Sequence, residues 1–198
     1  MEGRSALGAQ VAIEAGPSIG YYAPLGSSDG VNIPANFPGP ALGAELTLWS
    51  AHRFGVRGDA TFAAKAADKF VNPGGWDNRL AGQITMASVL ATYDISPERL
   101  HTVWLAAGPG VIHHGGDAFA RSGHPTNAAG VLAIGSSLQL AKTVGLTLGA
   151  SAFLYDYSGI FGALGGPPAV DGSVSNGYLA RHSQKDLIVY GAFAWIRP

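Results

Sequence analysis

Four ionisable side chains on three neighbouring apolar stretches are the first candidates for chemistry in this chain. They are Glu14, Glu45, Arg57 and Asp59. Charged groups are stable in a protein interior only when they are paired and hydrogen-bonded. One arginine among three carboxylates can meet that condition, so the four predict a buried ion-pair cluster. We expect a structural network that fills an interior; the alternative is a gate or a proton-sensitive latch.

A second group of candidates consists of imidazoles and one carboxylate on or beside a glycine-rich connection. The group is His113, His114, Asp117 and His124. These side-chain types bind zinc or copper, but their spacing matches no compact metal motif. A solvated loop is the simpler interpretation, and we expect no metal and no cofactor.

A third candidate is the pair His182 and Ser183, which suggests a hydrolase. Nucleophilic catalysis needs a base within hydrogen-bond reach of the nucleophile. Adjacent residues of a strand point to opposite faces, so this pair cannot easily meet. No Gly-x-Ser-x-Gly elbow surrounds Ser183, and the chain has no cysteine; we therefore expect no enzyme.

The elements that must position these residues are short stretches in which apolar residues alternate with small or polar ones. They span 10–22, 41–49, 54–63, 80–93, 100–112, 128–140, 144–155 and 185–196. The connections between them are alternately long and short. In an antiparallel meander every second connection lies at the same end, so the tight turns fall at one end and the long loops at the other. This polarity is typical of a transmembrane barrel of the outer membrane.

The composition also favours a membrane. Charged residues make up only 13% of the chain, hydrophobic residues 47%, and 29 residues are glycine. A soluble surface needs more charge than this. No uninterrupted run of 18 apolar residues occurs, and a closed barrel is the other structure that satisfies its backbone within a bilayer.

The alternation assigns each strand an oily face toward lipid and a small or polar face toward a lumen. Stretch 80–93 is the least regular, and Ile84, Met86 and Leu90 are expected on its oily face. The many small residues of the inner face predict a thin-walled lumen with room for a cavity near the loop end. Trp49, Tyr93, Trp104 and Phe153 are expected to plug the turn end. Aromatic residues near strand ends predict girdles at the two membrane interfaces, and two of the plug candidates, Tyr93 and Trp104, are among them. The girdle candidates are Tyr21, Tyr22, Tyr93, Trp104, Tyr155, Tyr157, Tyr190 and Trp195.

The chain resembles the small outer-membrane barrels of Gram-negative bacteria, the group with the OmpA-type transmembrane domain and the OmpW-like proteins. Three segments carry the resemblance: Ala15-Gly16-Pro17-Ser18-Ile19-Gly20-Tyr21-Tyr22, its echo Ala107-Gly108-Pro109-Gly110-Val111, and the closing Asp186-Leu187-Ile188-Val189-Tyr190-Gly191-Ala192-Phe193-Ala194-Trp195. The resemblance implies an all-β, eight-stranded, antiparallel up-and-down transmembrane barrel. It does not specify an activity.

We therefore expect a single barrel domain over 1–198, with 1–9 as an N-terminal periplasmic extension, in a bacterial outer membrane. Residues 1–5 do not form a signal peptide, so a mature chain is expected.

The first functional hypothesis is a structural or surface-interaction role. Its long loops, notably Ile160, Phe161 and Leu164, would bind a protein partner or join an envelope assembly. The alternatives are a narrow channel for small or apolar solutes and, third, a soluble lipocalin-like carrier. Membrane lipid is an expected partner and nucleic acid is not, because the net charge is −1.

Overall fold

The structure, a computed structural model, is an all-β closed barrel of eight antiparallel strands. It describes residues 12–25, 38–50, 53–67, 70–71, 77–78, 82–96, 101–116, 125–156 and 183–197. Around the barrel the strands follow the order β1-β10-β9-β8-β7-β6-β3-β2, and β1 closes on both β10 and β2. The predicted fold class is confirmed.

The barrel strands match the eight predicted stretches to within a few residues at each end. They are β1 (Ala12–Pro24), β2 (Gly39–Trp49), β3 (Phe54–Ala67), β6 (Gly82–Asp94), β7 (His101–Gly115), β8 (Thr126–Ala141), β9 (Val144–Asp156) and β10 (Ser183–Arg197). Two short strands outside the barrel, β4 (Phe70–Val71) and β5 (Asp77–Asn78), pair with each other between β3 and β6.

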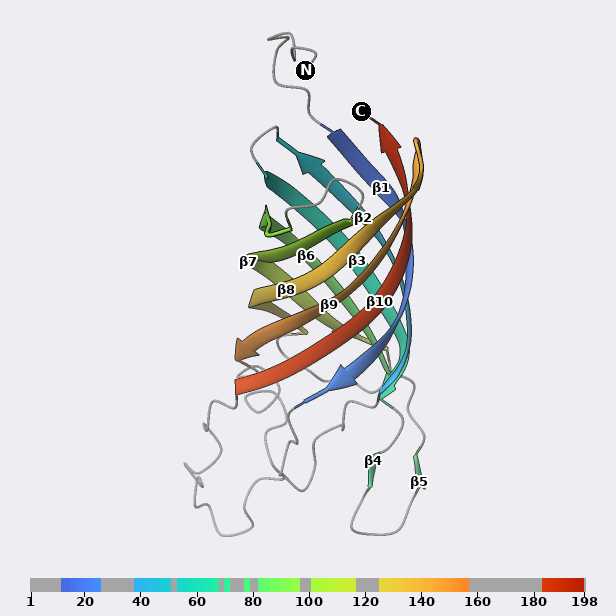
Figure 1. Cartoon of the computed structure of the whole chain (residues 1–198). Helices are drawn as coiled ribbons and strands as arrows, with labels where there is room; N and C mark the ends of the chain where they lie inside the picture. The colour runs from blue at the N-terminus through green and yellow to red at the C-terminus, as the bar shows by residue number, and fades with distance from the viewer. Residues whose placement is uncertain are drawn as a thin grey trace, which may run out of the picture.

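The ends of the barrel differ as the gap lengths predict. The first and last strands, β1 and β10, place both chain ends on the side where the short connections β2–β3, β6–β7 and β8–β9 lie (Figure 1). Backbone hydrogen bonds tie neighbouring elements together at this turn end. The Asp94 amide donates to the Arg53 carbonyl at 2.9 Å, and the Ile196 amide donates to the Thr143 carbonyl at 2.9 Å.

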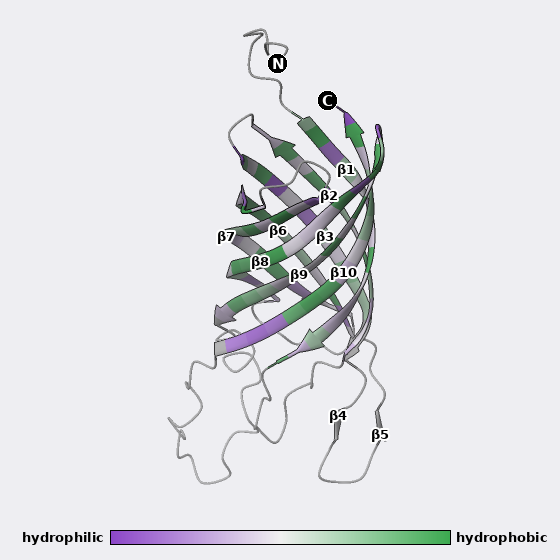
Figure 2. Ribbon diagram, viewed as in Figure 1, coloured by the Kyte–Doolittle hydropathy of each residue, from purple (hydrophilic) through white to green (hydrophobic). Residues whose placement is uncertain are grey.

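The exterior of the barrel is apolar. Ile19 is 67% exposed, and Leu148 and Leu42 are nearly as open, although each belongs to a strand whose alternate residues face inward. Figure 2 shows hydrophobic and hydrophilic residues alternating along the strands, with a strongly hydrophilic segment at the start of β10. Contact of such an apolar surface with water is unfavourable, whereas its contact with lipid is not. Among the described residues, no helix is long and apolar enough to cross a bilayer.

Two Gly-Pro steps interrupt the barrel's hydrogen-bond ladders on opposite sides. The β1–β10 register passes from Ala15↔Trp195 to Ser18↔Ala192 and omits Gly16 and Pro17. The β6–β7 register likewise passes from Ala91↔Ala107 to Ser88↔Gly110 and omits Gly108 and Pro109. Proline has no N–H to donate to a ladder. Four strands lie between these two seams in either direction around the barrel, so the repeated Ala-Gly-Pro motif marks two four-stranded halves.

Strand β6 corrects one predicted face. Ile84, Met86 and Leu90 are fully buried in the lumen, and the outer face carries Val89 and Tyr93 instead. The physical reason is that a lumen lined by many glycines has space to fill, and these larger side chains fill it.

The predicted aromatic positions are also partly wrong. Tyr22, Trp104 and Tyr155 are buried inside the barrel, and Tyr190 packs against the same core, so these residues form no girdle. Tyr21 and Trp195 do face outward. Tyr93 faces outward too and plugs nothing; its ring packs against Phe54 at 4.9 Å between centroids. Tyr157 lies outside the described residues.

Candidate functional site

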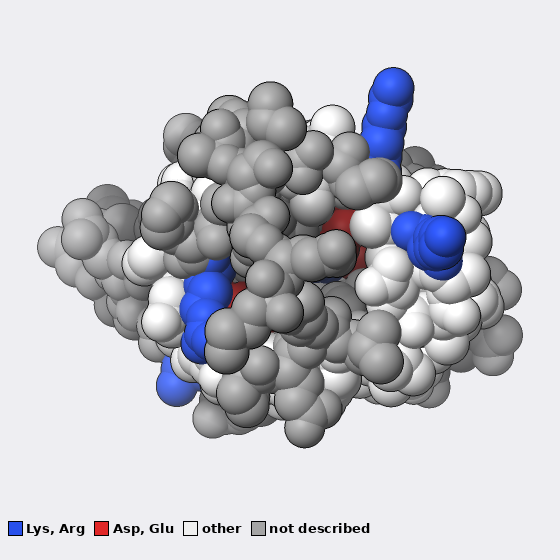
Figure 3. Space-filling view, turned by 45° about the horizontal axis from the view of Figure 1, so that its top comes forward, with Lys and Arg blue, Asp and Glu red and all other residues white. Residues whose placement is uncertain are grey.

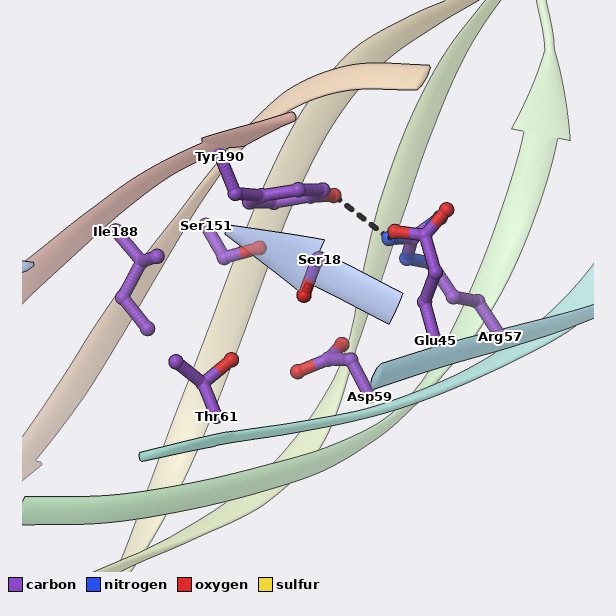
Figure 4. A pocket seen from close by; sticks show the side chains of 8 residues that line it. All are labelled: Ser18, Glu45, Arg57, Asp59, Thr61, Ser151, Ile188 and Tyr190. Atoms are coloured by element: carbon purple, nitrogen blue, oxygen red, sulfur yellow. Dashed lines mark hydrogen bonds and ion pairs between the residues drawn. The ribbon is translucent and has the colours of Figure 1, made fainter. Parts of the chain in front are cut away.

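The centre of the lumen is organised around the guanidinium of Arg57 on β3. It forms an ion pair and hydrogen bond with the Glu45 carboxylate on β2, and it donates to the Tyr190 hydroxyl on β10 at 2.8 Å (Figure 4). The guanidinium carbon also lies 4.6 Å from the centroid of the Trp104 ring, in cation–π geometry. Arg57 therefore links strands from both halves of the barrel.

The sequence positions these groups through the period of two. Glu45, Thr47 and Trp49 share the inner face of β2, and Arg57 and Asp59 share the inner face of β3. Glu45 stands opposite Asp59 in the β2–β3 register, and Thr47 stands opposite Arg57. Arg57 nevertheless pairs with Glu45, its diagonal neighbour on β2, and its guanidinium lies 3.5 Å from the hydroxyl of Thr47, the residue directly opposite.

The other two predicted cluster members have different partners. Asp59 accepts a hydrogen bond from the Ser88 hydroxyl of β6 at 2.7 Å. Glu14 interacts with the Trp49 side chain and feels the charges of Glu45 and Arg57 at longer range. The structure thus brings Glu45 and Arg57 into direct contact and places Asp59 and Glu14 around them.

Very little space remains beside this cluster. The cavity next to Arg57 has a volume of about 10 Å³, roughly the room that one water molecule needs. Its lining mixes charged, hydroxyl and aliphatic groups (Figure 4): Ser18, Glu45, Arg57, Asp59, Thr61, Ser151, Ile188 and Tyr190.

An apolar layer borders the central cluster on the loop side. Along β10, Ile188 separates Tyr190 from Asp186, and along β9, Phe153 separates Ser151 from Tyr155. These two side chains belong to one buried cluster with Ile84, Met86, Ile112 and Val131. The predicted roomy lumen near the loop end is wrong within the described residues, because large apolar side chains occupy it.

A second buried polar cluster lies beyond this layer, and sequence reasoning missed it. The Tyr155 hydroxyl donates to Asp186 Oδ2 at 2.8 Å, and Gln184 Nε2 donates to Asp186 Oδ1 at 3.2 Å. His114 Nε2 lies 3.3 Å from the same hydroxyl. An aspartate on an otherwise apolar inner face was the available signal.

The barrel wall separates two of the four residues considered above as metal ligands. His113 is exposed on the outside, where its Nδ1 lies 2.8 Å from the Thr126 hydroxyl, whereas His114 is buried in the lumen. These two imidazoles cannot bind the same ion. Asp117 and His124 lie outside the described residues, as do His182 and the loop positions Ile160, Phe161 and Leu164. Among the described residues no three potential ligands are grouped to hold a metal.

The comparisons with known proteins support the architecture. The structure matches neisserial surface protein A with a TM-score of 0.53 at 12% identity, over 96% of this chain and 99% of that one. It matches the outer-membrane protein OprG of Pseudomonas aeruginosa with a TM-score of 0.54 at 10% identity, over 94% and 95% of the two chains. The chain has the fold of the small outer-membrane barrels. At these identities the likeness establishes the fold alone. No protein-family model and no curated protein matches the sequence.

Proposed function

We propose that this chain is an outer-membrane barrel with a closed lumen, and that it acts through its loop end as a structural or surface-interaction protein. The shared fold and the apolar exterior support the membrane location. The main support for a closed lumen is that side chains fill its centre, where the cavity beside Arg57 has a volume of only about 10 Å³.

The closed state has two barriers in series. The first is the cross-lumen contact of Arg57 with Glu45, Tyr190 and Trp104. The second is the apolar layer around Phe153 and Ile188, which would exclude water and ions even if Arg57 changed rotamer. A solute that passed through the lumen would have to displace both.

The decisive experiment is conductance of the full chain in planar lipid bilayers, together with swelling of vesicles in small sugars. We expect no steady conductance and no swelling for the native chain. The double variant Arg57→Ala/Phe153→Ala, which removes one side chain from each barrier, should conduct. Ile134→Ala, on the lipid face, is the matched control and should remain closed. Steady conductance by the native chain would refute the closed lumen.

A contribution of the loops is tested separately. The loop variant Ile160→Ser/Phe161→Ser/Leu164→Ser should leave the barrel folded, which heat-modifiable gel mobility reports, and should change the size of the complex extracted from native membranes. An unchanged complex would count against these residues as the partner contact.

The second candidate is a narrow path for small apolar solutes, and the interrupted seams favour it. A solute could leave the wall where Gly16 and Pro17 break the β1–β10 ladder. Pro17→Ala would restore an N–H at that position and should slow such transport. The measurement is the rate at which vesicles take up a lipophilic dye. If vesicles that contain the native chain or Pro17→Ala take up the dye no faster than protein-free vesicles, this candidate fails.

A further inference from the structure

The described cations at the turn end are exposed rather than buried in the lumen. Arg53 in the β2–β3 turn, Lys142 in the β8–β9 turn and Arg197 at the end of β10 are all exposed. We call these three residues the cationic rim. In Figure 3, where the turn end comes forward, Lys and Arg side chains project from the surface at several points, while the small visible areas of Asp and Glu lie further in, one of them directly beside a basic side chain.

Each cation of the rim lies beside an exposed apolar side chain of the barrel wall. Arg53 precedes Phe54, which is 61% exposed, and Arg197 lies two residues after Trp195, which is 65% exposed. Lys142 lies two residues after Leu140, which is also exposed. Aromatic side chains of barrels mark the interface between hydrocarbon and head groups. The charged groups therefore reach the depth of the lipid phosphates.

Among the described residues, the carboxylates near this end form no ion pair with the rim. Asp94 accepts hydrogen bonds from the Ser96 amide at 2.8 Å and from the Ser96 hydroxyl at 2.7 Å. Glu14 lies on the inner face with Trp49. Within the part of the chain that the structure describes, the ion pair present is Arg57 with Glu45, deep in the lumen.

The backbone of Arg53 gives an independent reason to assign a role to its side chain. Its φ is 68°, in the left-handed region that glycine and asparagine adopt more readily. Its carbonyl accepts from the Asp94 amide, which fixes this conformation. A strained conformation held by a long cationic residue indicates that the side chain contributes something that glycine would not.

We propose that the cationic rim is a docking surface for anionic phospholipid head groups of the leaflet at the turn end, which is the periplasmic leaflet. This inference rests on the membrane location proposed above and is independent of whether the lumen conducts. Three cations at separate points of the rim would bind several phosphates, orient the barrel across the bilayer and fix its depth.

The test is urea unfolding of the full chain refolded into vesicles of phosphatidylcholine alone or mixed with phosphatidylglycerol. A basic residue near an anionic surface contributes about fivefold to an equilibrium constant at low salt. The native chain should therefore be more stable in the anionic vesicles by roughly a hundredfold in its folding equilibrium. Salt should abolish this preference because it screens exposed charges.

The triple variant Arg53→Gln/Lys142→Gln/Arg197→Gln should lose the preference while keeping its stability in neutral vesicles. Lys185→Gln is the matched control, because Lys185 is an exposed cation near the loop end. Arg53→Gly alone should raise stability in neutral vesicles and reduce the preference about fivefold. If the triple variant does not fold, the three single variants provide the same comparison. Retention of the full preference without the rim, or an equal loss in Lys185→Gln, would overturn the proposal. A native chain that conducts would overturn the closed lumen and leave this result unaffected.

Discussion

Removing Arg57 tests most directly how the lumen is held together. The residue is 3% exposed and makes the ion pair with Glu45 and the 2.8 Å hydrogen bond to Tyr190. Arg57→Met keeps much of the side-chain volume but leaves the Glu45 carboxylate buried without its cation. Breaking one partner of a buried ion pair costs about 3–5 kcal/mol. We therefore expect Arg57→Met to lower the free energy of unfolding by this amount.

A double-mutant cycle separates the pair from its surroundings. Glu45→Gln removes the carboxylate, and Arg57→Met/Glu45→Gln removes both charges, so the double variant should be more stable than the sum of the single effects predicts. Directly contacting residues show interaction energies of about 0.5–3 kcal/mol, and this pair should lie near the upper limit because both partners are buried.

The assay is urea unfolding in lipid vesicles, followed by tryptophan fluorescence and gel mobility. Glu14→Gln is the matched control, since Glu14 is only half-buried and interacts with Trp49 rather than directly with Arg57. It should cost about 1 kcal/mol or less. Unchanged midpoints for Arg57→Met, or strictly additive effects in the cycle, would refute the view that the pair fastens the lumen.

Three further predictions concern the wall and its filling. Ile134→Arg, on the lipid face, should destabilise the barrel by about 2–4 kcal/mol near the midplane, whereas a larger effect of Ser137→Arg on the inner face would show that the faces are inverted. Gly16→Ala should destabilise by about 1–3 kcal/mol, because a Cβ there would lie 1.7 Å from the Phe193 carbonyl oxygen. Gly130→Ala, whose Cβ would meet nothing within 4 Å, should raise stability by about 0.4–1 kcal/mol; similar unfolding midpoints for the two alanines would contradict the close approach at Gly16. Phe153→Ala should cost about 3–5 kcal/mol by opening a cavity in the apolar layer, and a midpoint equal to that of the native chain would place this side chain outside the core.

The sequence alone determined the strands, their antiparallel order and most of the outward-facing residues. Alternation with a period of two is a local property, and a membrane requires one face of every strand to be apolar. That requirement is visible in β1, β2, β8 and β10 without any knowledge of their neighbours. The lengths of the connections then separated the turn end from the loop end.

Only the tertiary structure decided what fills the lumen. Strand β6 carries both apolar and polar residues on each face, so its sequence does not specify which face points inward. Closure of the barrel turned Ile84, Met86 and Leu90 toward space left by glycines. Closure also brought Arg57 to Tyr190, 133 positions away in the chain, and joined Tyr155 to Asp186. Such contacts depend on the stagger between strands and on the tilt that closes the barrel, which are properties of all eight strands together.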